Sequence, residues 1–238
     1  MLEVHVLSSG HGQSVLVVFG GRHGLIIDCG HGWTSRPGPI ARWCARESNV
    51  DLRCVLISHV DSDHYCGLYE LLQGQDRRRH IRRVFVNDIE LKAAIDSLRK
   101  RHAYDQSIEE SPRETQSARS LALLADISAG RVRGLPLDAH REVVVNDQPE
   151  RLDLGPEFEG MQVSALAPSQ SIRGASRAGG ISSAGSGVWR TGRLESNLGS
   201  IVARIEYAGR SVLVCGDAEL RSWEDIEQRC GLPKSDCV

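Results

Sequence analysis

The chain has 238 residues, of which 40% are hydrophobic, and a formal net charge of -2. This length suffices for one large domain or two small ones with a substantial core. The near-zero charge excludes a uniformly basic surface for nucleic acid, and no apolar run approaches the roughly 18 residues of a membrane span. The seven cysteines form no CxxC pair, which is typical of reduced proteins with buried thiols. We therefore expect a cytoplasmic protein with no membrane partner, folded as one domain over residues 1–238.

Hydrophobic periodicity predicts strands and helices that alternate along the chain. Short apolar, β-branched runs separated by Gly-containing turns predict strands at residues 2–7, 14–19, 24–30, 51–58, 81–87, 142–145, 161–166, 198–207 and 211–215. Helical spacing predicts helices at residues 39–47, 68–72, 90–101, 115–128 and 222–229, the last with Ser222 as its N-cap. This order indicates an α/β or α+β fold with mixed sheets.

One long segment breaks the pattern of strands and helices. Residues 169–196 are rich in Gly, Ser, Ala and Arg and contain almost no periodic apolar residue. This composition predicts a flexible loop. Inside a compact unit, a loop of this length is either disordered or a functional lid.

Candidate metal ligands follow directly after the expected strand at residues 51–58. They are His59, Asp61, Asp63 and His64. Removing such groups from water at a strand end costs roughly several kcal/mol unless they are paired or bound to a metal. Imidazole and carboxylate ligands together suit zinc or manganese better than calcium. The pattern therefore predicts a metal site, and the alternative is a polar turn after a buried strand.

Two further expected strands end on an aspartate in a Gly-containing turn. These aspartates are Asp28, in Ile27-Asp28-Cys29-Gly30, and Asp217, after Gly216. Ligands from several strand ends can converge on one edge of a sheet, where a bridging carboxylate would hold two ions about 3.5–4 Å apart. Taken alone, Asp217 is better explained as an ordinary turn residue, and a structural turn role also stays open for Asp28.

Several of these segments resemble a known family. The stretch Ser58-His59-Val60-Asp61-Ser62-Asp63-His64 is similar to the Thr/Ser-His-x-His-x-Asp-His motif of the metallo-β-lactamase superfamily. Aspartate in the second ligand position is typical of the metallo-hydrolase domain of ComEC-type DNA-uptake proteins. Residues 4–17, 27–30 and 197–219 resemble further blocks of that branch, in the same order. The resemblance implies an αββα sandwich of two mixed sheets flanked by helices, with the site along one edge.

The resemblance also implies a ligand set for two divalent ions, zinc or manganese. One ion would be held by His59 and Asp61, and the other by Asp63 and His64. Asp217 would bridge the two ions.

Other roles follow from the same resemblance. Asp63 would also be catalytic, orienting or deprotonating the attacking water, and Asp28 would hold a ligand loop through hydrogen bonds. His11 and Asn197 are candidate cleft residues, although an isolated histidine in a Gly turn is more often simply exposed.

The chain departs from the family pattern in three places. Gln13 stands where the family has an acidic residue, and residues 166–168 offer no histidine. The family continues into a strand and a His-His-Gly-Ser segment, whereas this sequence stops at Val238. We therefore expect a C-terminally incomplete domain that lacks the last strand, the last helix and one ligand.

The function implied is a metal-dependent hydrolase that uses a metal-activated water. The ComEC-type resemblance favours a phosphodiesterase or nuclease, with nucleic acid or another phosphodiester as the substrate. Two alternatives stay open: hydrolysis of another ester, lactone or thioester, and a non-catalytic domain that binds a metal or a partner.

Overall fold

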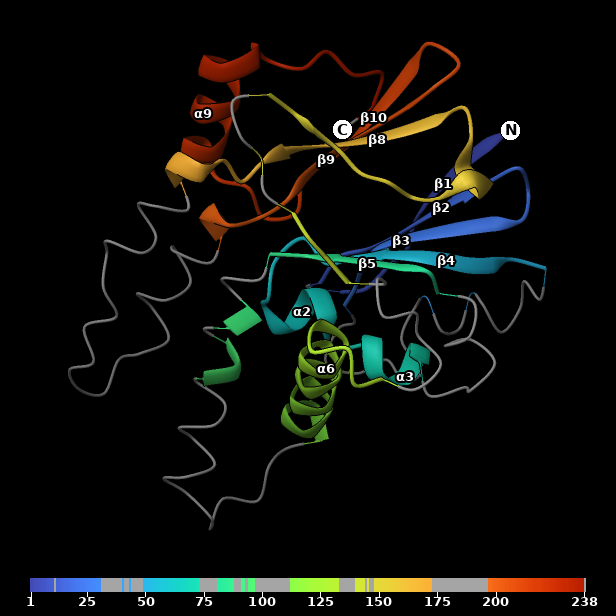
Figure 1. Cartoon of the computed structure of the whole chain (residues 1–238), viewed down its shortest axis with the longest axis vertical. Helices are drawn as coiled ribbons and strands as arrows, with labels where there is room; N and C mark the ends of the chain where they lie inside the picture. The colour runs from blue at the N-terminus through green and yellow to red at the C-terminus, as the bar shows by residue number, and fades with distance from the viewer. Residues whose placement is uncertain are drawn as a thin grey trace. The chain divides into compact units, whose positions relative to one another are not determined.

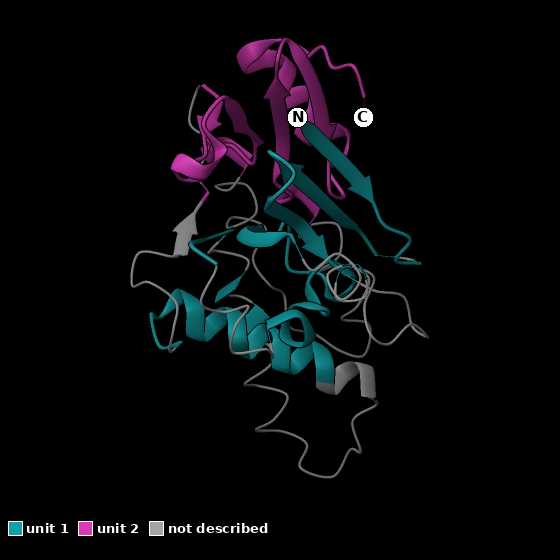
Figure 2. Ribbon diagram, turned by 90° about the vertical axis from the view of Figure 1, so that its right-hand side faces the viewer, with its two compact units in different colours: residues 1–142 teal, residues 143–238 magenta. Residues whose placement is uncertain are grey.

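The computed structural model describes residues 1–10, 12–30, 40, 43, 49–72, 81–87, 91–92, 94–96, 112–132, 140–143, 145, 148–172 and 197–237. The chain forms two compact units, residues 1–142 (unit 1) and residues 143–238 (unit 2), coloured separately in Figure 2. Each unit contains one β-sheet with helices packed against it. This confirms the expected mixed α/β class with two sheets flanked by helices, while the single domain over residues 1–238 stays a prediction.

The sheet of unit 1 has the strand order β1-β2-β3-β4-β5-β6 (Figure 1). The strands are β1 (Leu2–Val6), β2 (Ser14–Phe19), β3 (His23–Cys29), β4 (Asp51–Leu56), β5 (Arg83–Val86) and β6 (His140–Glu142). The first three pair antiparallel, and β3 to β6 pair in parallel. Carboxyl ends of neighbouring parallel strands meet at the same edge of a sheet. The residues that follow β3 and β4 therefore emerge side by side.

Three helices of unit 1 pack together and against this sheet: α2 (Ser62–Tyr65), α3 (Leu68–Leu72) and α6 (Pro112–Ser128) (Figure 1). Buried side chains of strands β2 to β5 form one core with those of α3 and α6. Each fully buried aliphatic side chain contributes about 1.5–3 kcal/mol. None of the helices among the described residues is both long and apolar enough to cross a bilayer.

A buried serine of α6 holds the junction between the two short helices. Ser120 is fully buried, its Oγ donates to the carbonyl of Cys66 at 2.8 Å, and it accepts the N–H of Tyr69 at 3.1 Å. These bonds satisfy backbone groups at the end of α2 and the start of α3, which a helix otherwise leaves unpaired at its ends. The long helix therefore fixes the helix that carries two of the predicted ligands.

Unit 2 contains an antiparallel sheet in the order β10-β9-β8-β7. Its elements are β7 (Glu150–Arg151), η1 (Pro156–Phe158), β8 (Met161–Ala167), β9 (Val202–Tyr207), β10 (Arg210–Val214) and α9 (Leu220–Cys230). Helix α9 buries Ile226 against Leu166, Val202 and Leu213 of the sheet. Gly231 ends α9 with a φ of 74°, a conformation that favours glycine.

Several predicted elements differ from the observed ones. The prediction of Ser222 as an N-cap is wrong, because α9 begins at Leu220 and Ser222 is buried inside the helix. The strand predicted at 142–145 is instead β6, which ends at Glu142, followed by an isolated bridge between Val145 and Ser169. The strand predicted at 198–207 begins only at Val202.

One further difference is helix α2, which was not predicted, and some predictions cannot be compared. Helix α2 follows Asp61, a residue type that favours the N-cap position, but the helix has only four residues, too few for a periodic signal. The predicted helices 39–47 and 90–101 fall largely outside the described residues, as does the predicted loop from residue 173 to residue 196.

Candidate metal centre

A buried carboxylate joins the carboxyl ends of β3 and β4. Asp28 is fully buried, and its Oδ1 accepts the backbone N–H of Ser58 at 2.7 Å. Its Oδ2 accepts the Ser58 hydroxyl at 2.6 Å and lies 2.8 Å from Nδ1 of His64. Each such hydrogen bond to a charged group contributes about 1.5–3 kcal/mol. They hold Asp28 in a left-handed backbone conformation, with a φ of 57°, which costs about 1–2 kcal/mol for a residue other than glycine.

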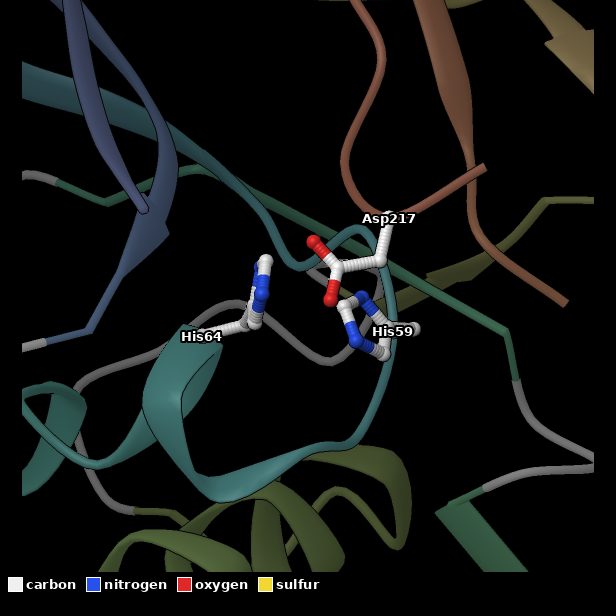
Figure 3. A group of neighbouring side chains, drawn as sticks. All are labelled: His59, His64 and Asp217. Carbon is white, nitrogen blue, oxygen red and sulfur yellow. The ribbon is translucent and has the colours of Figure 1, made fainter. Parts of the chain in front are cut away.

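Two buried imidazole rings lie next to this carboxylate. His59 follows β4 and His64 belongs to α2; they are 0% and 2% exposed. Their ring centroids are 4.0 Å apart, and Figure 3 shows the rings side by side. Nδ1 of His59 lies 3.1 Å from the Ser58 hydroxyl, and Nδ1 of His64 is bonded to Asp28. A histidine held in this way at one ring nitrogen is oriented to bind a metal through the other.

The two remaining predicted ligands of unit 1 are more exposed. Asp61 precedes α2 with its side chain 29% exposed, and its Oδ2 lies 3.9 Å from Nε2 of His59. Asp63 lies in the first turn of α2 and is half-buried. The Asp61 carbonyl accepts the N–H of His64 at 2.9 Å, which folds this segment into a compact loop and helix. The structure thus brings His59, Asp61 and His64 together and keeps Asp63 on the same short helix.

Two glycines lie against the backbone of this helix. A Cβ atom at either Gly12 or Gly30 would overlap the carbonyl oxygen of Asp63. Gly30 is held in place because its carbonyl accepts the Ser14 hydroxyl at 2.7 Å and its N–H donates to Gln13 at 3.0 Å. Only residues without a side chain allow the first hairpin and the end of β3 to approach α2 this closely.

Asp217 belongs to unit 2 and follows β10 in an exposed turn. Its backbone N–H donates to the Ser200 hydroxyl at 3.3 Å. Two residues further on, Glu219 accepts a hydrogen bond at 3.1 Å from the side-chain amide of Asn197, the predicted cleft residue. Asp217 is also labelled in Figure 3. The other predicted cleft residue, His11, lies outside the described residues.

The thiol of Cys29, next to Asp28, is poorly suited to binding a metal. Burial, with smaller contributions from Cys66 and Asp28, raises the pKa of Cys29 well above its ordinary value. Metals bind the thiolate rather than the thiol. The six cysteines in the described part of the chain are free. Cys29, which follows Asp28 at the end of β3, is therefore a poor candidate ligand beside the imidazole and carboxylate groups.

Sequence reasoning gave no role to three residues that organise these segments. Ser58 contacts Asp28 and both histidines, Ser200 holds the Asp217 turn, and Glu219 holds Asn197. Ser58 carries a weak signal, because it lies between a buried strand and the first candidate ligand. Ser200 and Glu219 lie in the block 197–219 that resembles the family, but the sequence does not reveal their contacts, since their partners are 17 and 22 residues away.

The donor set fits a divalent ion of the zinc or manganese type. Two buried imidazoles have their Nδ1 atoms next to hydrogen-bonding groups, which leaves Nε2 as the coordinating atom, and carboxylates are available at Asp61 and Asp63. Mixed imidazole and carboxylate ligation is typical of zinc and related transition metals. Calcium and magnesium prefer sites made of oxygen ligands.

Comparisons with known proteins give one family and no curated relative. The sequence model of the metallo-beta-lactamase superfamily matches residues 9–159. No curated protein matches the chain.

Similar solved structures include three proteins of low sequence identity. A Cronobacter sakazakii metallo-beta-lactamase with a HARLDQ motif is 14% identical, with 95% of this chain and 71% of that one covered and a TM-score of 0.42. Zinc-bound PqqB from Methylobacterium extorquens is 12% identical, with 89% and 61% covered and a TM-score of 0.41. The short form of human tRNase Z is 11% identical, with 90% and 68% covered and a TM-score of 0.43.

Proposed function

The chain belongs to the metallo-β-lactamase superfamily, and we propose that it is a metal-dependent hydrolase that cleaves a phosphodiester. One observation carries the metal site: Asp28 and Ser58 occupy the Nδ1 sides of two buried imidazoles, His64 and His59. Burying two imidazoles beside a carboxylate costs free energy, and metal binding is a function that this arrangement would serve. Arrangements of this kind fix the tautomer and orientation of metal-binding histidines.

The proposed centre holds two ions. His59 and Asp61 would hold one, Asp63 and His64 would hold the other, and Asp217 of unit 2 would add a carboxylate shared by both. The support is the donor set of unit 1 together with the place of Asp217, after a β-strand in a turn that resembles the corresponding block of the family. Bound zinc or manganese would supply a water of lowered pKa and an electrophile for the substrate oxygen.

The chain's own residues have distinct tasks in this proposal. Asp63 is half-buried, and its carboxylate accepts a proton from the attacking water. Asp28 keeps a proton on Nδ1 of His64 through the 2.8 Å contact. Glu219 orients the Asn197 amide through the 3.1 Å hydrogen bond, so that Asn197 can contact the substrate at the cleft.

The proposal of a phosphodiester substrate rests on the ComEC-type resemblance at Asp61. Most of the superfamily carries histidine in the second ligand position, whereas the ComEC-type branch carries aspartate, as this chain does. A carboxylate in place of an imidazole at this position suits manganese as well as zinc. Nucleic acid is the polymeric phosphodiester that this branch implies.

A substrate panel tests the proposal. Bis(4-nitrophenyl) phosphate, single-stranded DNA and RNA would be offered beside a lactone, a thioester and a β-lactam, each with zinc and with manganese. We expect hydrolysis of the phosphodiesters only, and its loss in Asp63→Ala but not in Asp153→Ala, an exposed aspartate of unit 2. Turnover of the lactone or thioester alone would contradict the substrate class, and metal binding without any turnover would indicate a non-catalytic domain.

A further inference from the structure

Ser58 lies between the buried carboxylate and both imidazole rings. It is fully buried, and its hydroxyl oxygen lies 2.6 Å from Oδ2 of Asp28 and 3.1 Å from Nδ1 of His59. Its distance to Nδ1 of His64 is longer, at 3.4 Å. Its backbone N–H donates separately to Oδ1 of Asp28 at 2.7 Å. The Ser58 side chain thus makes its two short contacts with the Asp28 carboxylate and the His59 ring.

The number of available protons decides the direction of these hydrogen bonds. A hydroxyl group has one proton, and a carboxylate has none to donate. The 2.6 Å contact with Asp28 therefore takes the Ser58 proton, because two acceptor oxygens would otherwise face each other. The Ser58 oxygen is left as an acceptor toward His59. The 3.1 Å contact is then a hydrogen bond only if His59 carries its proton on Nδ1.

We infer that Ser58 is a positioning residue that fixes the tautomer of His59 and so presents Nε2 of that ring to the metal. This inference rests on the metal site proposed above. The hydroxyl links the two groups, because it donates its proton to Asp28 and so can only accept a proton from His59. His64 needs no such link, since its Nδ1 meets Asp28 directly at 2.8 Å. Asp28 thereby determines the tautomer of both histidines, directly for His64 and through Ser58 for His59.

The two histidines are therefore expected to respond differently to removal of the hydroxyl. In Ser58→Ala the backbone bond to Asp28 remains, so the segment keeps its anchor, but Nδ1 of His59 loses its acceptor. The proton of His59 is then free to move to Nε2, which blocks that nitrogen as a ligand. Changes to the outer partners of metal-binding residues typically weaken metal affinity by about 10- to 100-fold.

The tautomers can be read directly in the metal-free protein. Long-range ¹H–¹⁵N NMR spectra of the ¹⁵N-histidine-labelled full chain distinguish a proton on Nδ1 from a proton on Nε2. We expect both rings to carry the Nδ1 proton in the wild type. In Ser58→Ala, only His59 should move toward the Nε2 form, and Ser58→Thr should restore the wild-type pattern. A wild-type His59 with its proton on Nε2 would overturn the inference without any variant.

Zinc affinity, measured by competition with a chelator, provides the second readout. We expect a loss of about 10- to 100-fold in Ser58→Ala and recovery in Ser58→Thr. Ser211→Ala is the matched control, since it removes another buried hydroxyl, which donates to Lys234 in unit 2. Equal zinc affinity in Ser58→Ala and the wild type would overturn the inference. Absence of zinc binding in the wild type would instead contradict the proposed function, and the NMR result would still decide the role of Ser58.

Discussion

The predicted ligands of unit 1 and the predicted ligand of unit 2 are held in very different ways. His59 and His64 are buried; the Ser58 hydroxyl lies next to both rings, and Asp28 contacts His64. Asp217 is exposed, and the described hydrogen bond at this residue comes from its backbone, to Ser200 at 3.3 Å. The first region is therefore arranged during folding, whereas the second presents a carboxylate on a turn.

This difference shows which part of the proposed site also contributes to the stability of the fold. Burying two imidazoles beside a carboxylate is favourable only if their hydrogen bonds are complete. An exposed carboxylate needs no such support. Unit 2 does contain a well-bonded carboxylate, but it is Asp225, on the face of α9. We therefore expect substitutions at the site in unit 1 to change both the stability of the fold and the affinity for metal. A substitution in unit 2 should change only one of these two quantities.

The largest effect is expected from Asp28→Asn. The amide group would place N–H donors against donors from Ser58 or His64, and it leaves buried groups unpaired. Breaking a buried charged network of this kind costs about 3–5 kcal/mol. Urea unfolding of the metal-free protein measures the change, with Asp153→Asn as an exposed control. A loss below about 1 kcal/mol would mean that the buried network does not support the fold.

Gly30→Ala should have the next largest effect. The new Cβ would overlap the Asp63 carbonyl oxygen, so the end of β3 and α2 must move apart. Overpacking against backbone typically costs about 1–3 kcal/mol, and we expect the upper end of this range. Gly209→Ala in unit 2 is the control, because its φ of 75° is strained for alanine but nothing lies within 4 Å of the new atom. Similar losses in the two variants would show that contact with α2 is unimportant.

Asp225 tests whether a partly buried carboxylate in unit 2 stabilises the fold without serving the site. Burial alone would raise the pKa of Asp225, but hydrogen bonds from Arg229, Ser169 and Ser171 outweigh it and lower the pKa. A lowered pKa gives stability above the unfolded value of about 3.9, and this stability is lost as the pH falls through the folded pKa. We expect Asp225→Asn to cost about 2 kcal/mol near neutral pH and to flatten the acid side of the stability curve.

Urea unfolding as a function of pH provides the measurement for Asp225. The wild type should lose stability toward acid more steeply than Asp225→Asn, while both bind zinc with equal affinity. Parallel pH profiles would show that the hydrogen bonds to Asp225 contribute nothing. Weaker zinc binding in the variant would show that the two regions are coupled, against the separation described above.

The smallest effect on folding is expected from Asp217→Ala. Because the side chain is exposed, the metal-free stability should change by less than about 0.5 kcal/mol. Zinc affinity should nevertheless fall by about tenfold or more, since a proposed bridging ligand is lost. Chelator competition and urea unfolding of the same preparation test both parts. Unchanged affinity would remove Asp217 from the ligand set.

The sequence predicted the parts of the fold that depend on local patterns. Strands β2, β4 and β10 were evident from apolar runs bounded by glycine or polar turns. Helix α2 was not predicted, because its four residues are too few for a periodic signal. The start of α9 was misplaced because Ser222, a good capping residue type, is instead buried within the helix.

The candidate site was predictable at the level of residue types but not of their contacts. The spacing of histidine and aspartate residues from His59 to His64 predicts a metal site within one segment. The hydrogen bonds of Asp28 link residues 30 and 36 positions apart, and a parallel strand pair creates that proximity. The role of Gly30 likewise depends on the approach of α2, which no local pattern reveals.

Elemental analysis of the purified full chain, prepared without chelator, tests the central proposal most directly. Two imidazole-carboxylate pairs bridged by Asp217 predict about two divalent ions, zinc or manganese, per chain. Asp217→Ala prepared in parallel should retain fewer ions than the wild type. A wild-type protein that contains no divalent metal, and takes up none on addition of zinc or manganese, would contradict the proposal.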